Sequence, residues 1–87
     1  AYTVTVGGRP VELTARQVEL LRCLAENAGR VLSREQLLNR VWGYDYYGDT
    51  RVVDTQIKRI RQKLPGEGVG FEIRTIYGVG YKLEEKA

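Results

Sequence analysis

The stretch DTRVVDTQIKRIRQKL, residues 49–64, decides the fold of this chain. Its apolar residues Val53, Ile57, Ile60 and Leu64 recur at the spacing of one face of an α-helix, so we predict a helix over residues 51–64. That segment carries five basic residues and one acid, a net charge of +4, although the whole chain has only +3. Positive charge concentrated on one helix indicates an anionic partner.

The face of this predicted helix that lies opposite the apolar residues is cationic and polar. At about 100° per residue it holds Arg51, Val52, Thr55, Lys58, Arg59 and Gln62. One flank holds Gln56 and Lys63, and the other holds Asp54 and Arg61. Arginine pairs with guanine and glutamine with adenine, so these residue types suit the reading of base edges. The alternative is a solvated amphipathic helix, but such a helix commonly pairs its cations with acids four residues away.

Two further helices are predicted before this one, and each starts with a capping box, in which a hydroxyl and a glutamine bond to the backbone. The two boxes are Thr14 with Gln17 and Ser33 with Gln36. The first helix covers about residues 15–28, and the second is short and ends at Gly43. Asp49 or Thr50 caps the basic helix.

A β-hairpin is predicted near each end of the chain. Residues 1–13 alternate apolar and polar side chains around the turn residues Gly7 and Gly8. FEIRTI (71–76) and YKL (81–83) flank the turn-forming YGVG in the same way. The order of hairpin, three helices and hairpin predicts one α+β domain over residues 1–87, with the layout of a winged helix-turn-helix.

The composition disfavours an enzyme and a metal protein. With no histidine and a single cysteine, Cys23, the usual zinc spacings and an internal disulfide cannot be formed. We interpret Cys23 as a small residue at the edge of the core. The acids Asp54, Glu67 and Glu72 occur singly, so we expect solvated surface groups rather than an acid/base pair. The glycine-rich turns lack the Gly-Lys-Ser/Thr ending of a phosphate loop, and we expect no cofactor.

The sequence contains no membrane-spanning or signal-peptide pattern, because no apolar run approaches the roughly 20 residues that cross a bilayer. We therefore expect a soluble, cytoplasmic domain without a membrane partner. A chain that opens on Ala1, directly in a strand-like stretch and without Met, is expected to be a piece of a longer protein.

Three stretches of the chain together resemble a known family. They are LTARQVELLRCLAENAGRVLSREQLLNRVWG (13–43), DTRVVDTQIKRIRQKL (49–64) and IRTIYGVGYKL (73–83). In this order and spacing they are similar to the effector domain of OmpR/PhoB-type response regulators, transcription factors of bacterial two-component signalling. The resemblance implies a winged helix-turn-helix that binds specific double-stranded DNA and self-associates on tandem sites. It also implies a phosphorylatable receiver domain, which residues 1–87 do not include.

The resemblance makes residues 51–64 the recognition helix. The side chains that it places nearest the bases are Asp54, Thr55, Gln56 and Arg59, and those that it places at phosphates are Arg51, Lys58 and Arg61. Arg51 has an alternative role, in which it pairs with an acid at the start of the helix. From the C-terminal hairpin, the resemblance places Arg74 and Thr75 near phosphate.

The hairpin around residues 77–80 is, by the same resemblance, the wing. The family commonly has an arginine that enters the minor groove at the position where this chain has Tyr77, so minor-groove reading does not carry over. Alternatively, Tyr77 packs against Tyr81 or the body of the hairpin. The family also usually opens with a longer N-terminal sheet, of which we expect only the last two strands here.

Residues 43–50 correspond to the loop that in such regulators contacts RNA polymerase. The loop contains Tyr44, Asp45, Tyr46 and Tyr47. Trp42 precedes it and is expected in the core, because it continues the apolar face of the second helix. Three tyrosines on a short loop are difficult to bury together, so at least one is expected to be exposed as a contact for protein or for the DNA backbone.

Two other classes of function remain open from the residues themselves. One is a protein-interaction winged helix, in which the basic helix meets an acidic partner and the tyrosine loop forms the hot spot. The other is an RNA-binding domain, although the exposed aromatic residues are expected on a loop rather than on a sheet platform. A steep loss of affinity with salt distinguishes a nucleic acid from a protein partner.

Overall fold

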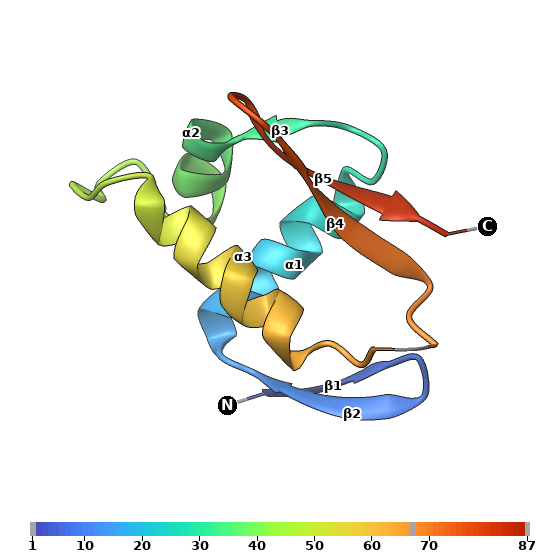
Figure 1. Cartoon of the computed structure of the whole chain (residues 1–87). Coiled ribbons are helices and arrows are strands. Elements are labelled where there is room, and N and C mark those ends of the chain that lie inside the picture. Colours follow the sequence, from blue (N-terminus) through green and yellow to red (C-terminus); the bar gives the residue numbers. More distant parts are fainter. Residues whose placement is uncertain (1, 67, 87) are drawn as a thin grey trace.

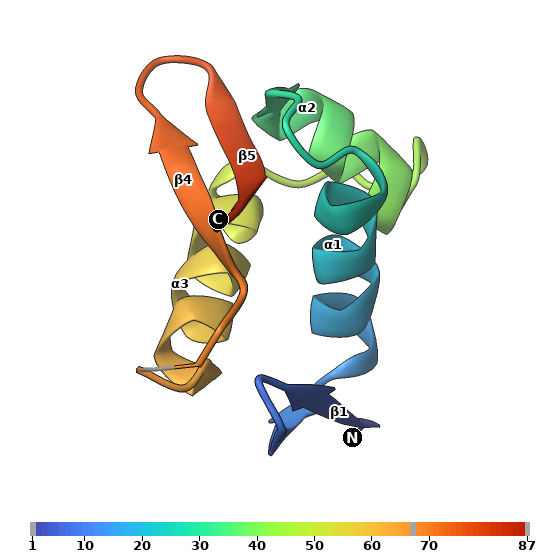
Figure 2. The same ribbon diagram turned by 90° about the vertical axis from the view of Figure 1, so that its right-hand side faces the viewer.

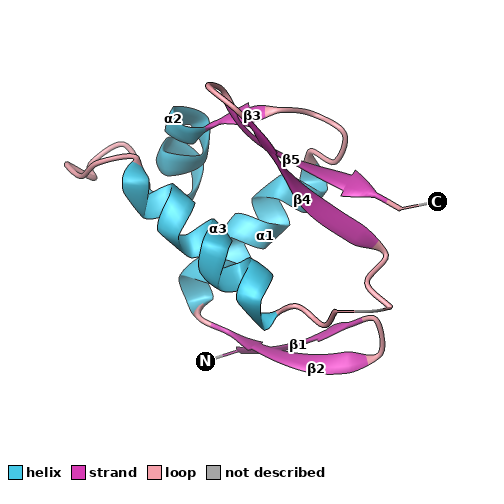
Figure 3. Ribbon diagram, in the orientation of Figure 1, coloured by secondary structure: helices cyan, strands magenta, loops and turns pink. Residues whose placement is uncertain are grey.

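The computed structural model describes residues 2–66 and 68–86, and it confirms the predicted order of hairpin, helices and hairpin (Figure 1). The strands are β1 (Tyr2–Val6), β2 (Arg9–Leu13), β3 (Leu32–Ser33), β4 (Phe71–Ile76) and β5 (Gly80–Glu85). The helices are α1 (Ala15–Glu26), α2 (Arg34–Leu37), the π-helical turn η1 (Leu38–Trp42) and α3 (Arg51–Lys63). One sheet contains β1 and β2, the other contains β3, β5 and β4 in that order, and α1 and α3 lie between them (Figure 3). The fold is an α+β winged helix-turn-helix.

The N-terminal hairpin turns where the sequence predicts. β1 and β2 pair antiparallel up to Val6, which lies opposite Arg9. Gly7 and Gly8 form the turn with φ of +57° and +78°, a conformation that favours glycine. A Cβ on Gly7 would lie 2.1 Å from the carbonyl oxygen of Gly68. The turn therefore packs directly against the segment that joins α3 to β4.

Both predicted capping boxes are present, at the starts of α1 and α2. In the first, the backbone N–H of Gln17 donates to Oγ1 of Thr14 over 3.2 Å, and the backbone N–H of Thr14 donates to Oε1 of Gln17 over 3.0 Å. α1 ends at Glu26, short of the predicted residue 28, because Asn27 leaves the helical conformation. Nδ2 of Asn27 then donates to the carbonyl oxygen of Cys23 over 2.8 Å and satisfies the last turn.

The second predicted helix consists of two short segments. α2 passes at Leu38 into the π-helical turn η1, which the apolar pattern did not predict. Gly43 ends η1 with φ of +94°, as the sequence predicts. The N–H of Gly43 donates to the carbonyl oxygens of Leu38 and Asn39, each over 3.1 Å. The helical segment therefore ends where the loop of residues 43–50 begins.

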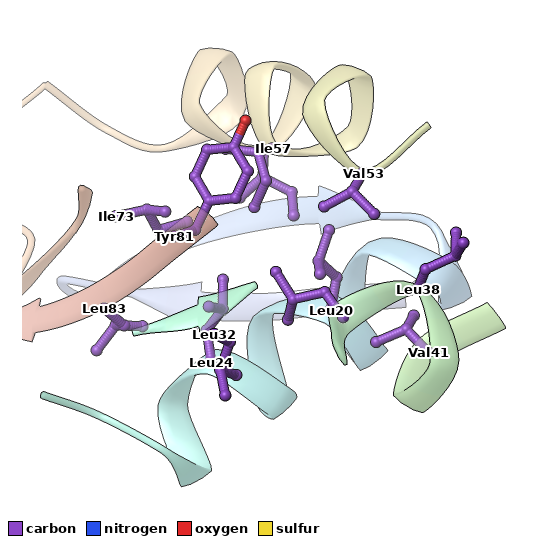
Figure 4. Close-up of a cluster of buried hydrophobic side chains, with 12 residues drawn as sticks. Leu20, Leu24, Leu32, Leu38, Val41, Val53, Ile57, Ile73, Tyr81 and Leu83 are labelled. Atoms are coloured by element: carbon purple, nitrogen blue, oxygen red, sulfur yellow. The ribbon is translucent and has the colours of Figure 1, made fainter. Parts of the chain in front are cut away.

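α3 supplies the centre of the core. Val53, Ile57 and Ile60 are fully buried and Leu64 is half-buried against the same cluster, which confirms the predicted apolar stripe. The other buried side chains of this cluster come from the remaining helices and the second sheet (Figure 4), and they are Leu20, Leu24, Leu32, Leu37, Leu38, Val41, Ile73, Tyr81 and Leu83. Cys23 lies half-buried at the edge, as predicted. Since one face of α3 is held in this core, the opposite face is presented to solvent.

β3 is a strand that the sequence did not predict. Leu32 and Ser33 pair with Tyr81 and Gly80 of β5. Two residues carry no periodic pattern, and their partners lie far along the chain. The close pairing of β3 with β5 requires a glycine at position 80, because a Cβ there would lie 2.0 Å from the carbonyl oxygen of Leu32. In the turned view, the β4–β5 hairpin stands beside α3, and α1 lies across from both (Figure 2).

Candidate nucleic-acid interface

The exposed side of α3 is cationic, as the helical wheel predicts. The exposed side chains opposite the core, which we call the outward face, are Arg51, Thr55, Lys58, Arg59 and Gln62, and Arg61 and Lys63 are exposed on the two flanks. Val52, which the wheel also places on the outward side, is instead half-buried against the core. Within residues 2–66 and 68–86, neither Lys58 nor Arg59 forms a salt bridge. The hydroxyl of Thr55 donates to the carbonyl oxygen of Arg51 over 3.2 Å, so its oxygen can still accept a hydrogen bond. Unpaired cations beside a hydroxyl are able to contact phosphates and base edges.

Arg51 pairs with the acid that precedes the helix, which is the alternative role predicted for it. Its Nε lies 3.0 Å from Oδ2 of Asp49, and its backbone N–H donates to Oδ1 of Asp49 over 2.9 Å. Asp49 therefore caps α3, whereas Thr50 makes no capping bond with its side chain. The hydrogen bond from the Arg51 backbone is the main cause that lowers the pKa of Asp49. Because the pair is exposed, it contributes little to stability and leaves the guanidinium accessible.

The prediction that Asp54 is a solvated surface acid is wrong. Its Oδ1 accepts hydrogen bonds from Nε of Arg34, 2.9 Å away in α2, and from the hydroxyl of Tyr81 in β5, which points toward α3 (Figure 4). The Asp54 side chain is 34% exposed, and within the described residues only Oδ2 remains for a base edge. Glu72 is exposed as predicted, and Glu67 lies outside the described residues. Sequence reasoning missed Arg34 and Tyr81, because no local pattern links them to Asp54.

The Asp54 carboxylate affects the titration of both of its partners. Its hydrogen bond is the main cause that raises the pKa of Arg34. Burial is the main cause that raises the pKa of Tyr81, and the hydrogen bond to Asp54 adds to it. Arg34 therefore stays charged and Tyr81 keeps its proton at neutral pH, so the two donors to Asp54 persist there.

Arg61 and Thr75, both predicted phosphate contacts, connect α3 to β4. Nη2 of Arg61 donates to the carbonyl oxygen of Ile73 over 2.6 Å and to Oγ1 of Thr75 over 2.9 Å. The guanidinium carbon of Arg61 lies 5.7 Å from the centre of the Tyr81 ring, within the range of a cation–π contact. These bonds hold the wing against α3 and reduce the number of donors that Arg61 offers to an external anion.

Arg74 is also paired inside the protein. Its Nη1 lies 3.1 Å from Oε1 of Glu84 on the neighbouring strand, and Nζ of Lys82 lies 2.8 Å from the same oxygen. Lys82 is the main cause that lowers the pKa of Glu84, and Arg74 adds to it. A phosphate contact by Arg74 therefore requires that a phosphate oxygen replace the Glu84 carboxylate.

Gln56 lies on the flank of α3 that faces α1. Its Oε1 accepts a hydrogen bond from Nε2 of Gln17 over 3.0 Å, and Lys63 on the same flank donates to Oε1 of Gln17 over 3.0 Å. The sequence indicated Gln17 only as a capping residue, yet it is 2% exposed and lies between the two helices. A two-bond contact with adenine requires both amide atoms of Gln56, and its oxygen already has a partner inside the protein.

The tip of the wing is exposed and uncharged. Tyr77 is 91% exposed, so it does not pack against Tyr81 or the body of the hairpin, which was the alternative prediction. Gly78 turns the hairpin with φ of +78°. Val79 is exposed beside it, although the sequence had not indicated this residue. The tip thus offers an aromatic ring, a hydroxyl and a branched side chain, but no cation for a narrow minor groove.

The loop of residues 43–50 projects from the body of the protein (Figure 1). Tyr44 is 85% exposed and Tyr47 is 99% exposed, which confirms that at least one tyrosine of the loop faces solvent. Asp45 and Tyr46 are exposed as well. The loop therefore presents several aromatic side chains to a partner.

Trp42 fixes the base of this loop. It is half-buried against the core, as predicted, and its ring centre lies 6.5 Å from that of Tyr46. The guanidinium of Arg16 lies 5.2 Å from the centre of the Trp42 ring, and its Nη1 donates to the carbonyl oxygen of Val41 over 2.7 Å. Arg16 thereby contacts both Val41 and Trp42, the last two residues of η1, so the loop starts from a fixed point.

Among the described residues, no group of three or more His, Cys, Asp or Glu side chains could hold a metal ion. No helix in those residues is both long enough and apolar enough to cross a membrane.

Comparison with known sequences gives one family for most of the chain. The profile of the family described as "Transcriptional regulatory protein, C terminal" matches residues 8–83. The uncharacterized transcriptional regulatory protein YclJ of Bacillus subtilis (strain 168) is 52% identical over 83 residues, which cover 94% of this chain and 36% of YclJ. The chain spans just over a third of the length of the curated relatives that it matches.

Solved structures with the same fold include isolated DNA-binding domains and longer regulators. DrrB of Thermotoga maritima, an OmpR/PhoB homolog, has a TM-score of 0.80 and 42% identity over 95% of this chain and 38% of DrrB. The Klebsiella pneumoniae RstA DNA-binding domain, solved in complex with the RstA box, has a TM-score of 0.78 and 34% identity over 94% of this chain and 82% of that domain. The family is one of transcription-regulator domains rather than of enzymes. The chain belongs to this family, the winged-helix DNA-binding domains of OmpR/PhoB-type response regulators.

Proposed function

We propose that this chain binds specific sequences of double-stranded DNA with α3 in the major groove, as the output domain of a two-component transcriptional regulator. The proposal rests mainly on Lys58 and Arg59, which are exposed on the outward face and form no salt bridge within the described residues. The core holds the opposite face of α3, so these cations stand on a rigid element.

The base contacts come from the outward face and its two flanks. Arg59 reads a guanine edge and Thr55 accepts one hydrogen bond, because these side chains are exposed and the Thr55 hydroxyl already donates to the carbonyl oxygen of Arg51. Asp54 and Gln56 each contribute one side-chain atom, since the other atom bonds inside the protein. Lys58 and Arg51 contact phosphates and set the position of the helix on the duplex.

The wing contributes at the edge of the same interface. Arg74 reaches phosphate when a phosphate oxygen replaces Glu84. Arg61 and Thr75 approach phosphate from the same side, and their bond to each other keeps the wing beside α3. Tyr77 contacts the DNA surface with its ring or hydroxyl rather than with a charge.

A second activity of the domain, contact with RNA polymerase, is favoured by the loop of residues 43–50. Tyr44 and Tyr47 are almost fully exposed, and Trp42 and Arg16 fix the base of the loop. Aromatic side chains on a fixed support are the usual anchors of protein interfaces. In the whole protein, we propose a receiver domain on the same chain, self-association on tandem DNA sites, a cytoplasmic location and no catalysis.

A salt titration of duplex binding, followed by fluorescence anisotropy, tests the proposal. The logarithm of the association constant should fall linearly with the logarithm of the salt concentration, because phosphate contacts release counterions. Lys58→Ala should make that slope shallower by about one unit. Arg22→Ala, which removes an exposed cation from α1, should leave it unchanged. An equal slope for Lys58→Ala and the wild type would remove Lys58 from the interface, and weak salt dependence overall would favour a protein partner.

A further inference from the structure

Gln17 is a buried polar side chain whose amide group links α1 to α3. Its Oε1 accepts hydrogen bonds from the backbone N–H of Thr14 and from Nζ of Lys63, each over 3.0 Å. Its Nε2 donates to Oε1 of Gln56 over 3.0 Å. Three partners from three positions in the chain thus meet at one amide that is only 2% exposed.

The two donors to Gln17 determine which way its amide faces. A backbone N–H and a lysine ammonium only donate hydrogen bonds, so the group that faces Thr14 and Lys63 has to be the amide oxygen. The amide nitrogen of Gln17 therefore faces Gln56. Because that nitrogen is a donor, Gln56 in turn has to present its oxygen to Gln17.

This arrangement also fixes what Gln56 presents outward. With its oxygen bonded toward α1, the amide nitrogen of Gln56 is the atom left at the flank of the outward face. A glutamine that reads adenine uses its oxygen for N6 and its nitrogen for N7 together. The bond from Gln17 removes the first of these two contacts, and a single donor remains.

We propose that Gln17 is a positioning residue for base selection, which sets Gln56 as a hydrogen-bond donor to the major groove. A donor there favours guanine or thymine, whose only polar groups in the major groove are acceptors, over adenine, which presents one acceptor and one amino group. It disfavours cytosine most, because the cytosine edge presents an amino group. The proposal rests on the proposed function and deepens it, because it assigns a base preference to one contact of α3. Gln17 itself lies on α1 and touches no DNA.

Gln17→Glu provides a direct test, because it reverses the direction of the hydrogen bond between residue 17 and Gln56. A glutamate at this position keeps the capping bond to Thr14 and the pairing with Lys63, but it offers an acceptor where Gln17 offers a donor. The amide of Gln56 should turn over, donate to the new carboxylate and expose its oxygen. The preferred base at that one position should shift from guanine or thymine to cytosine or adenine, by about fivefold, the effect of roughly one hydrogen bond.

The measurement uses the 87-residue chain and the best duplex that the wild type selects from randomised DNA. Affinities are measured for all four base pairs at each position of that duplex, and the ratio among bases is compared rather than the absolute affinity. The ratio is needed because a new carboxylate weakens binding to every duplex by repulsion. Gln56→Ala should flatten the preference at the same position, and the double variant should behave like Gln56→Ala alone.

Several outcomes would overturn the inference. Gln17→Glu could leave the ratios among bases unchanged while Gln56→Ala removes the base preference at one position. Gln17 would then not determine which amide atom Gln56 presents to DNA. If Gln56→Ala weakens all duplexes equally, Gln56 contacts phosphate, and sequence-specific binding by the domain still stands. A wild type that shows no preference among duplexes contradicts the proposed function itself.

Should Gln17→Glu fail to fold by circular dichroism, Gln17→Met leaves Gln56 free to turn. Adenine should then gain about fivefold relative to guanine, and no gain would overturn the inference.

Discussion

The hydroxyl of Tyr81 in the wing donates a hydrogen bond to the carboxylate of Asp54 in α3. The same carboxylate oxygen accepts a hydrogen bond from Arg34 at the start of α2. The guanidinium of Arg61, about two turns further along α3, lies over the ring of Tyr81. Polar contacts to a single tyrosine therefore fix the orientation of the wing relative to α3, in addition to the core beneath them.

Tyr81→Phe should lower the free energy of unfolding by about 1–3 kcal/mol, because it removes a hydrogen bond to a charged group and keeps the ring. Urea denaturation measures this change. Tyr77→Phe is the matched control, since the hydroxyl of Tyr77 lies at the exposed wing tip and its loss should change stability by less than about 0.5 kcal/mol. Equal losses in the two variants would show that the Tyr81 hydroxyl does not support the fold.

Gly80→Ala should destabilise the domain by about 1–3 kcal/mol or more, as expected for a side chain forced into a packed site. The new Cβ would lie 2.0 Å from the carbonyl oxygen of Leu32, so β3 has to move away from β5. In Gly66→Ala, by contrast, no atom of the described residues lies within 4 Å of the new Cβ, and the change should stay within about 0.5 kcal/mol. Thermal denaturation compares the two. A Gly80→Ala variant that melts with the wild type would contradict the pairing of β3 with β5.

Glu84 should make stability depend on pH in the acid range. Its pKa is lowered in the folded protein, chiefly by Lys82, so its contribution is present above the ordinary glutamate pKa of about 4.3 and is lost as the pH falls through the lowered value. Glu84→Gln should therefore be less stable than the wild type at pH 7, and the difference should shrink at pH 3. Glu12→Gln, at an exposed position of β2 without a salt bridge within the described residues, is the control. A difference for Glu84→Gln that is the same at both pH values would contradict this role.

Tyr77→Arg should tighten DNA binding, and the gain should be larger on sites whose flank beside the wing is rich in A·T pairs. An arginine gains from the strongly negative potential of a narrow minor groove, whereas a tyrosine carries no charge. Tyr77→Ala should have little effect on folding, because the ring is almost fully exposed. Anisotropy titrations on duplexes with A·T-rich and G·C-rich flanks measure the effect. Equal gains on both flanks would place the new arginine outside the minor groove.

The sequence predicted those features of α3 and its surroundings that depend on local periodicity. The helical wheel assigned Gln56 and Asp54 to opposite flanks of α3, and in the structure Gln56 bonds to α1 whereas Asp54 bonds to α2 and β5. The two capping boxes, the apolar stripe and the glycine turns followed from the same kind of local rule.

The partners across the fold could not be predicted, because periodicity describes one element at a time. Nothing local links Asp54 to Tyr81, which lies 27 positions further along the chain, or Gln56 to Gln17, which lies 39 positions before it. The strand β3 was missed for the same reason, since its hydrogen bonds go to distant residues of β5. These long-range bonds decide which side-chain atoms α3 keeps for DNA.

We propose that the outward face of α3 reads DNA sequence, and substitution of Arg59 is the sharpest test of this role. Affinities of the wild type, Arg59→Ala and Lys58→Ala are measured for every single-base substitution in the site that the wild type selects from random duplexes. Arg59→Ala should lose about 1–3 kcal/mol on the preferred site and accept any base at one position, whereas Lys58→Ala should weaken all duplexes equally. An Arg59→Ala protein that keeps every base preference of the wild type would show that this face of α3 does not read sequence through Arg59.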